Sequence, residues 1–238
     1  MCDLCKRIVK PKSNEMKTKI FLISAVLLAT LSANAQFKKY TFGLKAAPQV
    51  SWMKPNTDGY EGNGAKLAFS WGFVSEFAFS ENHCLATGFN VVFNGGNLKF
   101  PYLLDENTGT LSREYFVKSI ELPLTLKMRT NEIGNMRYYG QIGFGTSFRF
   151  DAKKADEFSY TNTTTSSDKV NYDNVSFLRE SLIIGLGGEY TIDAGTTFSV
   201  GLALNNGFTD MLTGKNPIDS EKEKATLNFV ELNLAVLF

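Results

Sequence analysis

The sequence holds few of the residues that most site chemistry requires. Its 238 residues include one histidine, three cysteines and six prolines, which leaves little material for a His/Cys metal site or a disulfide-stapled module. The net charge of +1 provides no basic field for nucleic acid. No apolar run reaches the roughly 20 residues of a transmembrane helix. What is abundant is apolar and aromatic: 43% of residues are hydrophobic and 20 are Phe, which excludes a disordered chain.

The residues before position 36 have the pattern of an export signal. A twelve-residue apolar run, Ile20 to Leu31, follows Lys17 and Lys19 and precedes Ala33-Asn34-Ala35-Gln36. At about 1.5 Å per residue, this run is too short for a hydrocarbon core of about 30 Å. A buried helix of a soluble protein would carry alternating polar residues and would not end in A-x-A. We therefore predict a secretory signal peptide cut between Ala35 and Gln36.

The predicted leader changes the composition of what remains. Met16 is the expected true start, so residues 1–15 are an upstream extension, and their Cys2-x-x-Cys5 pair leaves with the leader. Residues 1–35 carry six basic and two acidic side chains, so 36–238 carries 19 basic and 22 acidic ones. It retains one cysteine, Cys84, so no intrachain disulfide is possible. We expect 36–238 to form a single domain.

After Gln36 the dominant pattern is an alternation with a period of two, which places successive side chains on opposite faces of a strand. One face of each segment is uniformly Leu, Ile, Val, Phe, Tyr or Trp, and the other is mostly Gly, Ala, Ser and Asn with a few charges. Eight segments show this pattern: about 38–52, 65–79, 84–94, 116–129, 136–150, 177–192, 197–205 and 227–238.

The composition of the two faces indicates which medium each one meets. A soluble sandwich would carry many Lys, Glu and Thr on its solvent face. Small residues with a few charges suit instead the interior of a narrow barrel, and large apolar residues suit a lipid-facing exterior. The segments have the length of tilted membrane strands. We predict an all-β fold, an eight-stranded antiparallel up-and-down transmembrane β-barrel, in which closure removes the sheet edges that lipid does not tolerate.

The connections between the segments alternate strictly between long and short. Outer-membrane barrels have short periplasmic turns and long outer loops, so a periplasmic N-terminus places the long connections outside. Those connections look hydrophilic: 161–168 is rich in Thr, Ser and Asn, and 219–224 is mostly charged. The expected connections are 53–64, 80–83, 95–115, 130–135, 151–176, 193–196 and 206–226.

Aromatic residues fall near both ends of the predicted strands, as in the two belts that flank the lipid band of membrane barrels. Those expected at the periplasmic ends are Tyr40, Phe79, Tyr138, Tyr190, Phe198 and Phe238. Those expected at the outer ends are Trp52, Phe93, Phe116, Phe148 and Phe150.

Particular stretches resemble a known family, the PorT-like outer-membrane β-barrel proteins common in Bacteroidetes. The most specific stretch is Ile120-Glu121-Leu122-Pro123-Leu124-Thr125-Leu126-Lys127, accompanied by the leader end and by stretches 42–47 and 184–190. A last strand ending in Phe238 resembles the terminal signal read by the barrel-insertion machinery. The resemblance covers essentially all of 36–238 and implies an outer-membrane location. It implies little about function, because fold alone does not transfer function.

The inward-facing ionisable residues are the candidate site. Eight strands leave space only for side chains, and buried charges require partners, so we expect a plug of paired charges with the excess basic groups at wet lumen mouths. A narrow, anion-preferring pore is the alternative. The predicted lumen network comprises Lys45, Lys66, Glu76, Glu121, Lys127, Arg129, Arg137, Arg149, Arg179, Glu189 and Glu231.

Catalysis and cofactor binding find little support in the sequence. The only histidine, His83, is expected in a short turn at the opposite end from the outer loops, so no Ser-His pair is expected at those loops. A carboxylate pair such as Glu121 and Glu231 is the remaining acid–base option. No phosphate-loop, zinc-protease or EF-hand spacing occurs, and the glycines of 143–145 and 185–188 are expected to make room for large lumen neighbours. We expect no enzyme activity and no cofactor.

Two residues complicate the predicted strands. Pro123 lies mid-strand and predicts a bulge or a local break. Glu180 falls on the lipid face, which requires either a position above the membrane or a register error of one residue. The favoured function is a binding or structural barrel in outer-membrane lipid with an unidentified partner for its outer loops. A narrow solute pore and a secreted lipocalin-like barrel are the alternatives.

Overall fold

The computed structural model describes residues 39–238 except 105–106, 162, 194, 217 and 219–221. The predicted extension and signal peptide, including Met16 and the cleavage position between Ala35 and Gln36, lie outside these residues. Within the described part of the chain, no helix is long and apolar enough to cross a membrane.

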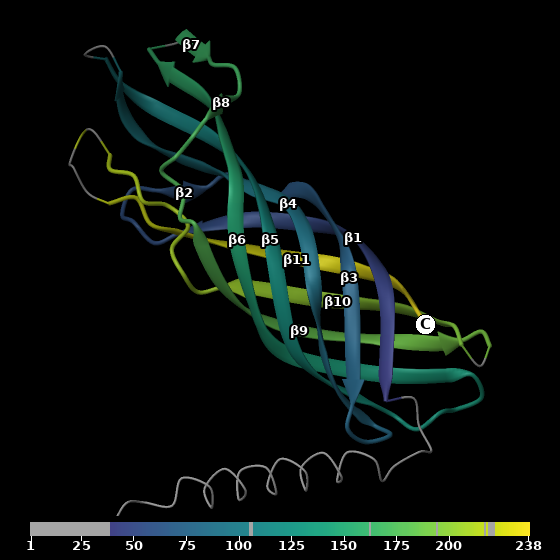
Figure 1. The fold of residues 1–238 in the computed structure, drawn as a ribbon. Coiled ribbons are helices and arrows are strands. Elements are labelled where there is room, and N and C mark those ends of the chain that lie inside the picture. The colour runs from purple at the N-terminus through teal and green to yellow at the C-terminus, as the bar shows by residue number, and fades with distance from the viewer. Residues whose placement is uncertain (1–38, 105–106, 162, 194, 217, 219–221) are drawn as a thin grey trace, which may run out of the picture. The chain divides into compact units, whose positions relative to one another are not determined.

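The described chain forms a single antiparallel sheet closed into a ring (Figure 1). Eight strands make the ring in the order β1-β3-β4-β5-β6-β9-β10-β11, and β11 pairs with β1. The strands are β1 (Tyr40–Pro55), β2 (Glu61–Gly62), β3 (Lys66–Ala78), β4 (His83–Leu104), β5 (Asn107–Arg129), β6 (Met136–Tyr160), β7 (Thr163–Ser166), β8 (Val170–Asn171), β9 (Leu178–Thr191), β10 (Thr197–Gly207) and β11 (Ala225–Leu237). The predicted eight-stranded up-and-down barrel is confirmed.

The large apolar side chains point out of the ring. Leu67 is 85% exposed, Leu186 is 67% and Phe144 is 58%, whereas Glu121 and Lys127 are buried. A Leu or Phe side chain gains about 1.5–3 kcal/mol when it leaves water, so a belt of this kind requires a non-aqueous surrounding. The predicted assignment of apolar residues to the exterior and charged residues to the interior is therefore confirmed.

The short connections lie at the end of the barrel where the described chain begins and ends. In the turn between β9 and β10, the Asp193 carboxylate accepts hydrogen bonds from the backbone N–H groups of Gly195 and Thr196 at 2.8 and 2.7 Å. Such a side chain substitutes for a backbone acceptor and fixes a tight turn. The turn between β5 and β6 contains Gly134 with φ of +66°, a conformation that favours glycine.

Two of the expected outer loops are strand extensions. The alternation of β4 and β5 continues to Leu104 and Asn107, and β6 continues to Tyr160. Beyond the apolar belt the pattern inverts: Leu98 and Phe100 point inward and are buried, and Lys99 between them is exposed. The expectation of loops was wrong for 95–104, 107–115 and 151–160, because the face that carries the apolar residues changes where lipid gives way to water, whereas 161–176 is a connection with two short added strands.

A β-bulge interrupts the alternation of side chains along β6, so the sequence pattern does not predict the extension of this strand. The pairing of β5 with β6 shifts between Lys118 and Ser119, which face Asp151 and Arg149, so Phe150 is the extra residue. A bulge of one residue turns the following side chains to the other face. Inward positions on β6 are odd-numbered up to Arg149 and even-numbered from Ala152 on.

The two residues that complicated the predicted strands are accommodated locally. At Pro123 the β4–β5 ladder loses two residue pairs and keeps its register, and the Thr87 hydroxyl donates to the Pro123 carbonyl at 2.9 Å. This is the local break rather than the bulge. Glu180 points outward as the third residue of β9 and accepts a hydrogen bond from the Thr146 hydroxyl at 2.9 Å. Its register was therefore correct, and it lies at the outer end of its strand.

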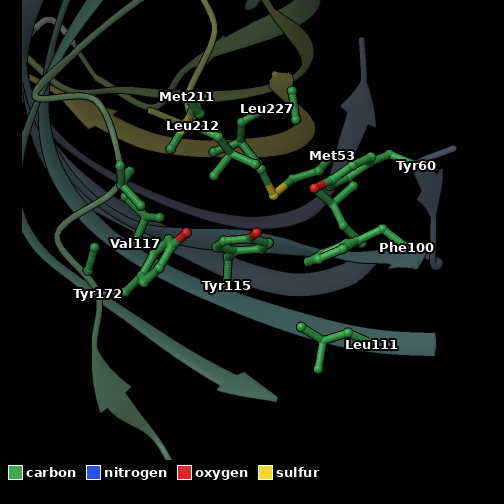
Figure 2. Packing of buried hydrophobic residues seen from close by; sticks show 14 of the residues in the cluster. Met53, Tyr60, Phe100, Leu111, Tyr115, Val117, Tyr172, Met211, Leu212 and Leu227 are labelled. Carbon is green, nitrogen blue, oxygen red and sulfur yellow. The ribbon is translucent and has the colours of Figure 1, made fainter. Parts of the chain in front are cut away.

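The long-connection end of the barrel is closed by a hydrophobic cluster, here called the outer cap. Figure 2 shows Met53, Tyr115 and Leu227 pointing toward one another. The expectation of hydrophilic outer connections is corrected, since parts of them supply this core. The outer cap comprises Met53, Tyr60, Leu98, Phe100, Leu111, Tyr115, Val117, Ala152, Phe158, Tyr172, Val175, Met211, Leu212, Ala225 and Leu227.

The outer cap predicts a local stability effect. Phe100 is 1% exposed and stacks on Tyr60 at a centroid distance of 4.3 Å. Phe100→Ala is expected to destabilise the cap by about 3–5 kcal/mol and to increase proteolysis within 95–115, while the barrel stays folded. Leu103→Ala, at a 40% exposed position, is the control. Equal protease resistance of the two variants would show that the cap has no core of its own.

Candidate functional site: the lumen charge network and the outer cap

Four charged side chains cross the lumen near the short-turn end. Lys127 and Arg129 on β5 each contact Glu76 on β3 and Glu189 on β9. The Lys127 Nζ to Glu76 Oε1 distance is 2.7 Å, and the Arg129 Nε to Glu189 Oε2 distance is 2.9 Å. Because the two carboxylates come from opposite sides of β5 around the ring, this quartet ties separated walls together.

Tyr139 lies above the quartet, and glycines make space for it. The Lys127 ammonium is 4.0 Å from the centroid of the Tyr139 ring, within the range of a cation–π contact. A methyl group at Gly187 or Gly201 would collide with that ring or its hydroxyl. At these two positions glycine is therefore required by a large lumen neighbour, as was expected for Gly187 and not considered for Gly201.

A second group links the first and last strands of the ring. Lys45 on β1 pairs with Glu231 on β11 at 2.8 Å. The Gln49 amide donates to Glu231 at 3.2 Å and to the Ser70 hydroxyl at 2.8 Å. These contacts add side-chain bonds between β1, β3 and β11, where the ring closes.

A third group surrounds Glu121. The Asn205 amide donates to Glu121 Oε2 at 2.9 Å, and Arg179 Nη1 lies 3.8 Å from the same oxygen. Arg179 also donates to Asn205 Oδ1 at 2.6 Å and to the Leu227 carbonyl at 2.8 Å. The predicted network did not include Gln49 and Asn205, although both have inward parity, because it was restricted to ionisable side chains.

Two of the predicted lumen residues lie at strand ends, and a third, Arg149, faces inward but stands outside the three paired groups. Lys66 pairs with outward-facing Glu114 at 2.8 Å, because β3 begins at Lys66 and its side chain reaches over the strand end. Arg137 pairs with Glu132 of the short turn at 2.9 Å and is partly exposed at the rim. Arg149 lies beside Arg179 and Phe177 near the outer end and has no carboxylate partner within ion-pair distance among the described residues.

The ion-paired charges of the lumen are therefore balanced, and Arg149 adds one inward cation without a carboxylate partner among the described residues. Four cations, Lys45, Lys127, Arg129 and Arg179, face four carboxylates, Glu76, Glu121, Glu189 and Glu231. The cavity left between them has a volume of about 80 Å³, room for a few water molecules. The seven-to-four excess deduced from parity is reduced to five to four, because Lys66 and Arg137 lie at the ends of their strands.

None of the catalytic alternatives considered above is assembled into a complete site in the described part of the chain. His83 is the exposed first residue of β4, and its Nδ1 is 3.0 Å from the Ser80 hydroxyl, so the one Ser-His contact of the described residues lies at the short-turn end and not at the outer loops. Glu121 and Glu231 both line the small cavity, but each already holds the partners described above. Among residues 39–238, outside the gaps, no group of three His, Cys, Asp or Glu side chains could hold a metal ion. Cys84 is free and buried.

The outer cap contains a buried polar centre that pattern analysis missed. Arg113 binds Asp156 through two hydrogen bonds of 2.6 and 3.0 Å, and Glu223 accepts from Tyr60 and Tyr172 at 3.3 and 3.2 Å. Burial opposes ionisation of Asp156, but the hydrogen bonds and charges of Arg113 and Lys154 outweigh it and lower the pKa of this carboxyl. Burial raises the pKa of Tyr172 to about 12. The inward parity of Arg113, continued from Glu121, was the available signal.

A closed eight-stranded ring with an apolar exterior and a charged, paired interior defines an outer-membrane β-barrel. The sequence of residues 29–213 matches the family described as outer membrane protein beta-barrel domain. The chain belongs to this family, and the protein is a β-barrel of the outer membrane. The secreted, lipocalin-like alternative is thereby wrong.

Several solved structures are similar to this chain. Neisserial surface protein A has 10% identity and a TM-score of 0.45, with 84% of this chain and 96% of that chain covered. OprG from Pseudomonas aeruginosa has 12% identity and a TM-score of 0.48, with coverages of 84% and 95%. Ail of Yersinia pestis has 13% identity and a TM-score of 0.35, with coverages of 84% and 100%. The comparison with curated sequences gave no match.

Removal of one charge from the quartet is expected to reduce the stability of the barrel strongly, and removal of a second, opposite charge is expected to restore part of it. Lys127→Met leaves Glu76 and Glu189 buried with fewer partners and is expected to cost about 3–5 kcal/mol. The double variant Lys127→Met/Glu189→Gln is expected to lose less than the single one, because one uncompensated charge is removed. Urea unfolding in lipid vesicles, followed by gel migration, measures both. Arg137→Met at the rim, with an expected loss below about 1 kcal/mol, is the control.

The Arg113–Asp156 pair predicts acid sensitivity of the outer cap. Because the pKa of Asp156 is lowered in the folded protein, its contribution is complete above the unfolded value of about 3.9. It is lost as pH falls through the folded value. Near-ultraviolet circular dichroism of the cap tyrosines is expected to decrease over this acid range. Asp156→Asn is expected to lack this transition, and an identical titration in both proteins would contradict the assignment.

Proposed function

We propose that this protein is a closed, non-conducting membrane anchor that presents the outer cap at the cell surface as a binding element. The observation that carries the proposal is the lumen, where four cations and four carboxylates leave about 80 Å³. A conducting pore needs a continuous aqueous path, and porins with such paths have 16–18 strands. The outer cap adds a second closure above the network.

The binding face that the cap supports best is a polar groove on its outer side. This groove has a volume of about 310 Å³ and is lined by residues of the extended sheet and its short added strands, including Asn63, Asn97, Ser112, Glu157 and Ser166. Amide, hydroxyl and carboxylate groups suit a hydrophilic ligand bound through hydrogen bonds. No catalytic role is proposed.

The barrel-insertion machinery is the proposed partner of the last strand. Phe238 is 55% exposed on the outer surface, and its backbone bonds to Phe42 at 2.6 and 3.1 Å close the ring. A terminal strand that pairs last is available for recognition before closure. Within the family, we propose a PorT-like subgroup on the basis of the stretch Ile120–Lys127, and a cleaved signal peptide before Gln36.

Conductance across a planar bilayer tests the closed state. The purified protein is expected to give no stable current. Glu76→Ala/Arg129→Ala removes one anion and one cation of the quartet, keeps the net charge, and is expected to create a small measurable current. Arg137→Ala, at the rim, is the control and is expected to behave like the unaltered protein. A steady current through the unaltered protein would show that the barrel is a pore.

A further inference from the structure

An apolar groove of about 420 Å³ lies on the outward wall of β3, β4 and β5. Its floor contains Leu67, Phe69 and Phe93, which are 85%, 43% and 38% exposed, together with Phe116, and Lys66 and Lys118 stand at its rim. We call these six residues the lysine-rimmed groove. Nothing in the ring covers its floor, and Leu67 is among the most exposed apolar side chains of the protein.

The groove straddles the outer boundary of the lipid band. On β5 the outward residues from Met128 to Ile120 are apolar, and the next outward residue is Lys118. These nine residues span about 31 Å along a strand, or roughly 24 Å at the usual tilt of about 40°, close to the height of the lipid-facing band of such barrels. Phe93 is the cross-strand neighbour of Lys118, and Leu67 follows Lys66, so ammonium and apolar groups lie side by side at this boundary. The groove continues into the lipid band through Phe69.

Four lysines gather around the aromatic ring of Phe116. The Nζ atoms of Lys66 and Lys169 are 3.1 and 3.9 Å from the ring centroid, Lys153 is the cross-strand partner of Phe116 on β6, and Lys118 follows on the same face of β5. Such a concentration of ammonium groups is unfavourable unless anions lie nearby.

The protein supplies only part of the required negative charge. Glu114 pairs with Lys66 at 2.8 Å and Asp151 pairs with Lys118 at 2.9 Å. Lys153 and Lys169 have no carboxylate within ion-pair distance in the described chain. The cluster therefore carries two uncompensated positive charges directly above an apolar surface.

The basic outward residues at this boundary are concentrated beside the groove, with Lys54 at the outer end of the neighbouring strand β1 as a further one. On the opposite wall, the outward residues at the same boundary are Glu180 on β9 and Asn206 on β10. A general adaptation to the membrane surface would place basic residues around the whole circumference. Their concentration beside the apolar groove favours recognition of one bound molecule.

We propose that the lysine-rimmed groove binds a phosphorylated lipid of the outer leaflet. Acyl chains would lie on Leu67, Phe69 and Phe93, and the phosphate would be held by Lys153 and Lys169, with Lys66 and Lys118 beside it. Lysine ammonium groups near a membrane surface attract anionic headgroups, and the apolar floor at acyl depth selects a lipid over a soluble anion. This site is separate from the lumen, and it adjoins the polar groove of the cap through Glu114, which pairs with Lys66 and lines that groove.

Native mass spectrometry of the purified protein in detergent micelles tests the site with diphosphorylated lipid A as the probe. Lys153→Gln/Lys169→Gln removes the two uncompensated charges and leaves no carboxylate without its partner. At about fivefold in affinity for each lysine, binding is expected to weaken about twenty-five-fold. Leu67→Gln is expected to weaken binding as well, because the acyl surface becomes polar.

The matched control is Lys99→Gln/Lys224→Gln, which removes the same charge from two exposed lysines of the outer end and is expected to bind like the unaltered protein. Heat-modifiable gel migration verifies that every variant is folded. Equal weakening by the two double variants would show a diffuse charge effect and overturn the proposal. Displacement of the lipid by inorganic phosphate, with Leu67→Gln unchanged, would show a simple anion site and overturn it too.

Discussion

The structure depends on one constraint: each long strand passes from lipid into water, while its inner face is cut off from both. In the lipid-facing part, apolar side chains point outward and the few ions point inward. Above Lys118 on β5 the arrangement reverses, so that Tyr115 and Leu111 are buried inside and Ser112 faces outward. One strand therefore carries two opposite amphipathic patterns. The barrel wall and the outer cap follow the same rule, that apolar side chains face away from water, applied once in lipid and once in water.

The closed interior makes charge balance obligatory. A buried ion without a partner is strongly destabilising, and the lumen pairs four of its cations with four carboxylates. Glycine is part of the same solution, since Gly187 and Gly201 allow Tyr139 to cover Lys127. The network leaves too little space for a solute. This supports a role for the protein at its surfaces, in the polar groove of the cap and along the lipid-facing wall.

Sequence reasoning succeeded where one rule held over a whole segment. Alternation predicted the ring, its strand number and the face toward lipid. It failed at the boundary between solvents, where Leu98 and Phe100 belong to the core of a strand that had been taken to end at Asn94. It failed also at Phe150, where one extra residue reverses the parity of β6. Arg113, Asp156 and Glu223 were missed for this reason, since their burial depends on elements that pattern analysis regarded as loops.

The sequence by itself determined the architecture and the outer-membrane location, because a period of two with an apolar outer face admits few arrangements in lipid. It also determined which residues face the lumen along the regular part of each strand. Only the tertiary structure decided the partners. Parity places Glu189 and Lys127 inside, but their contact depends on strand stagger and side-chain reach across the ring. Lys66 shows the limit: its backbone position is inward, yet its ammonium group lies over Phe116 because β3 begins there.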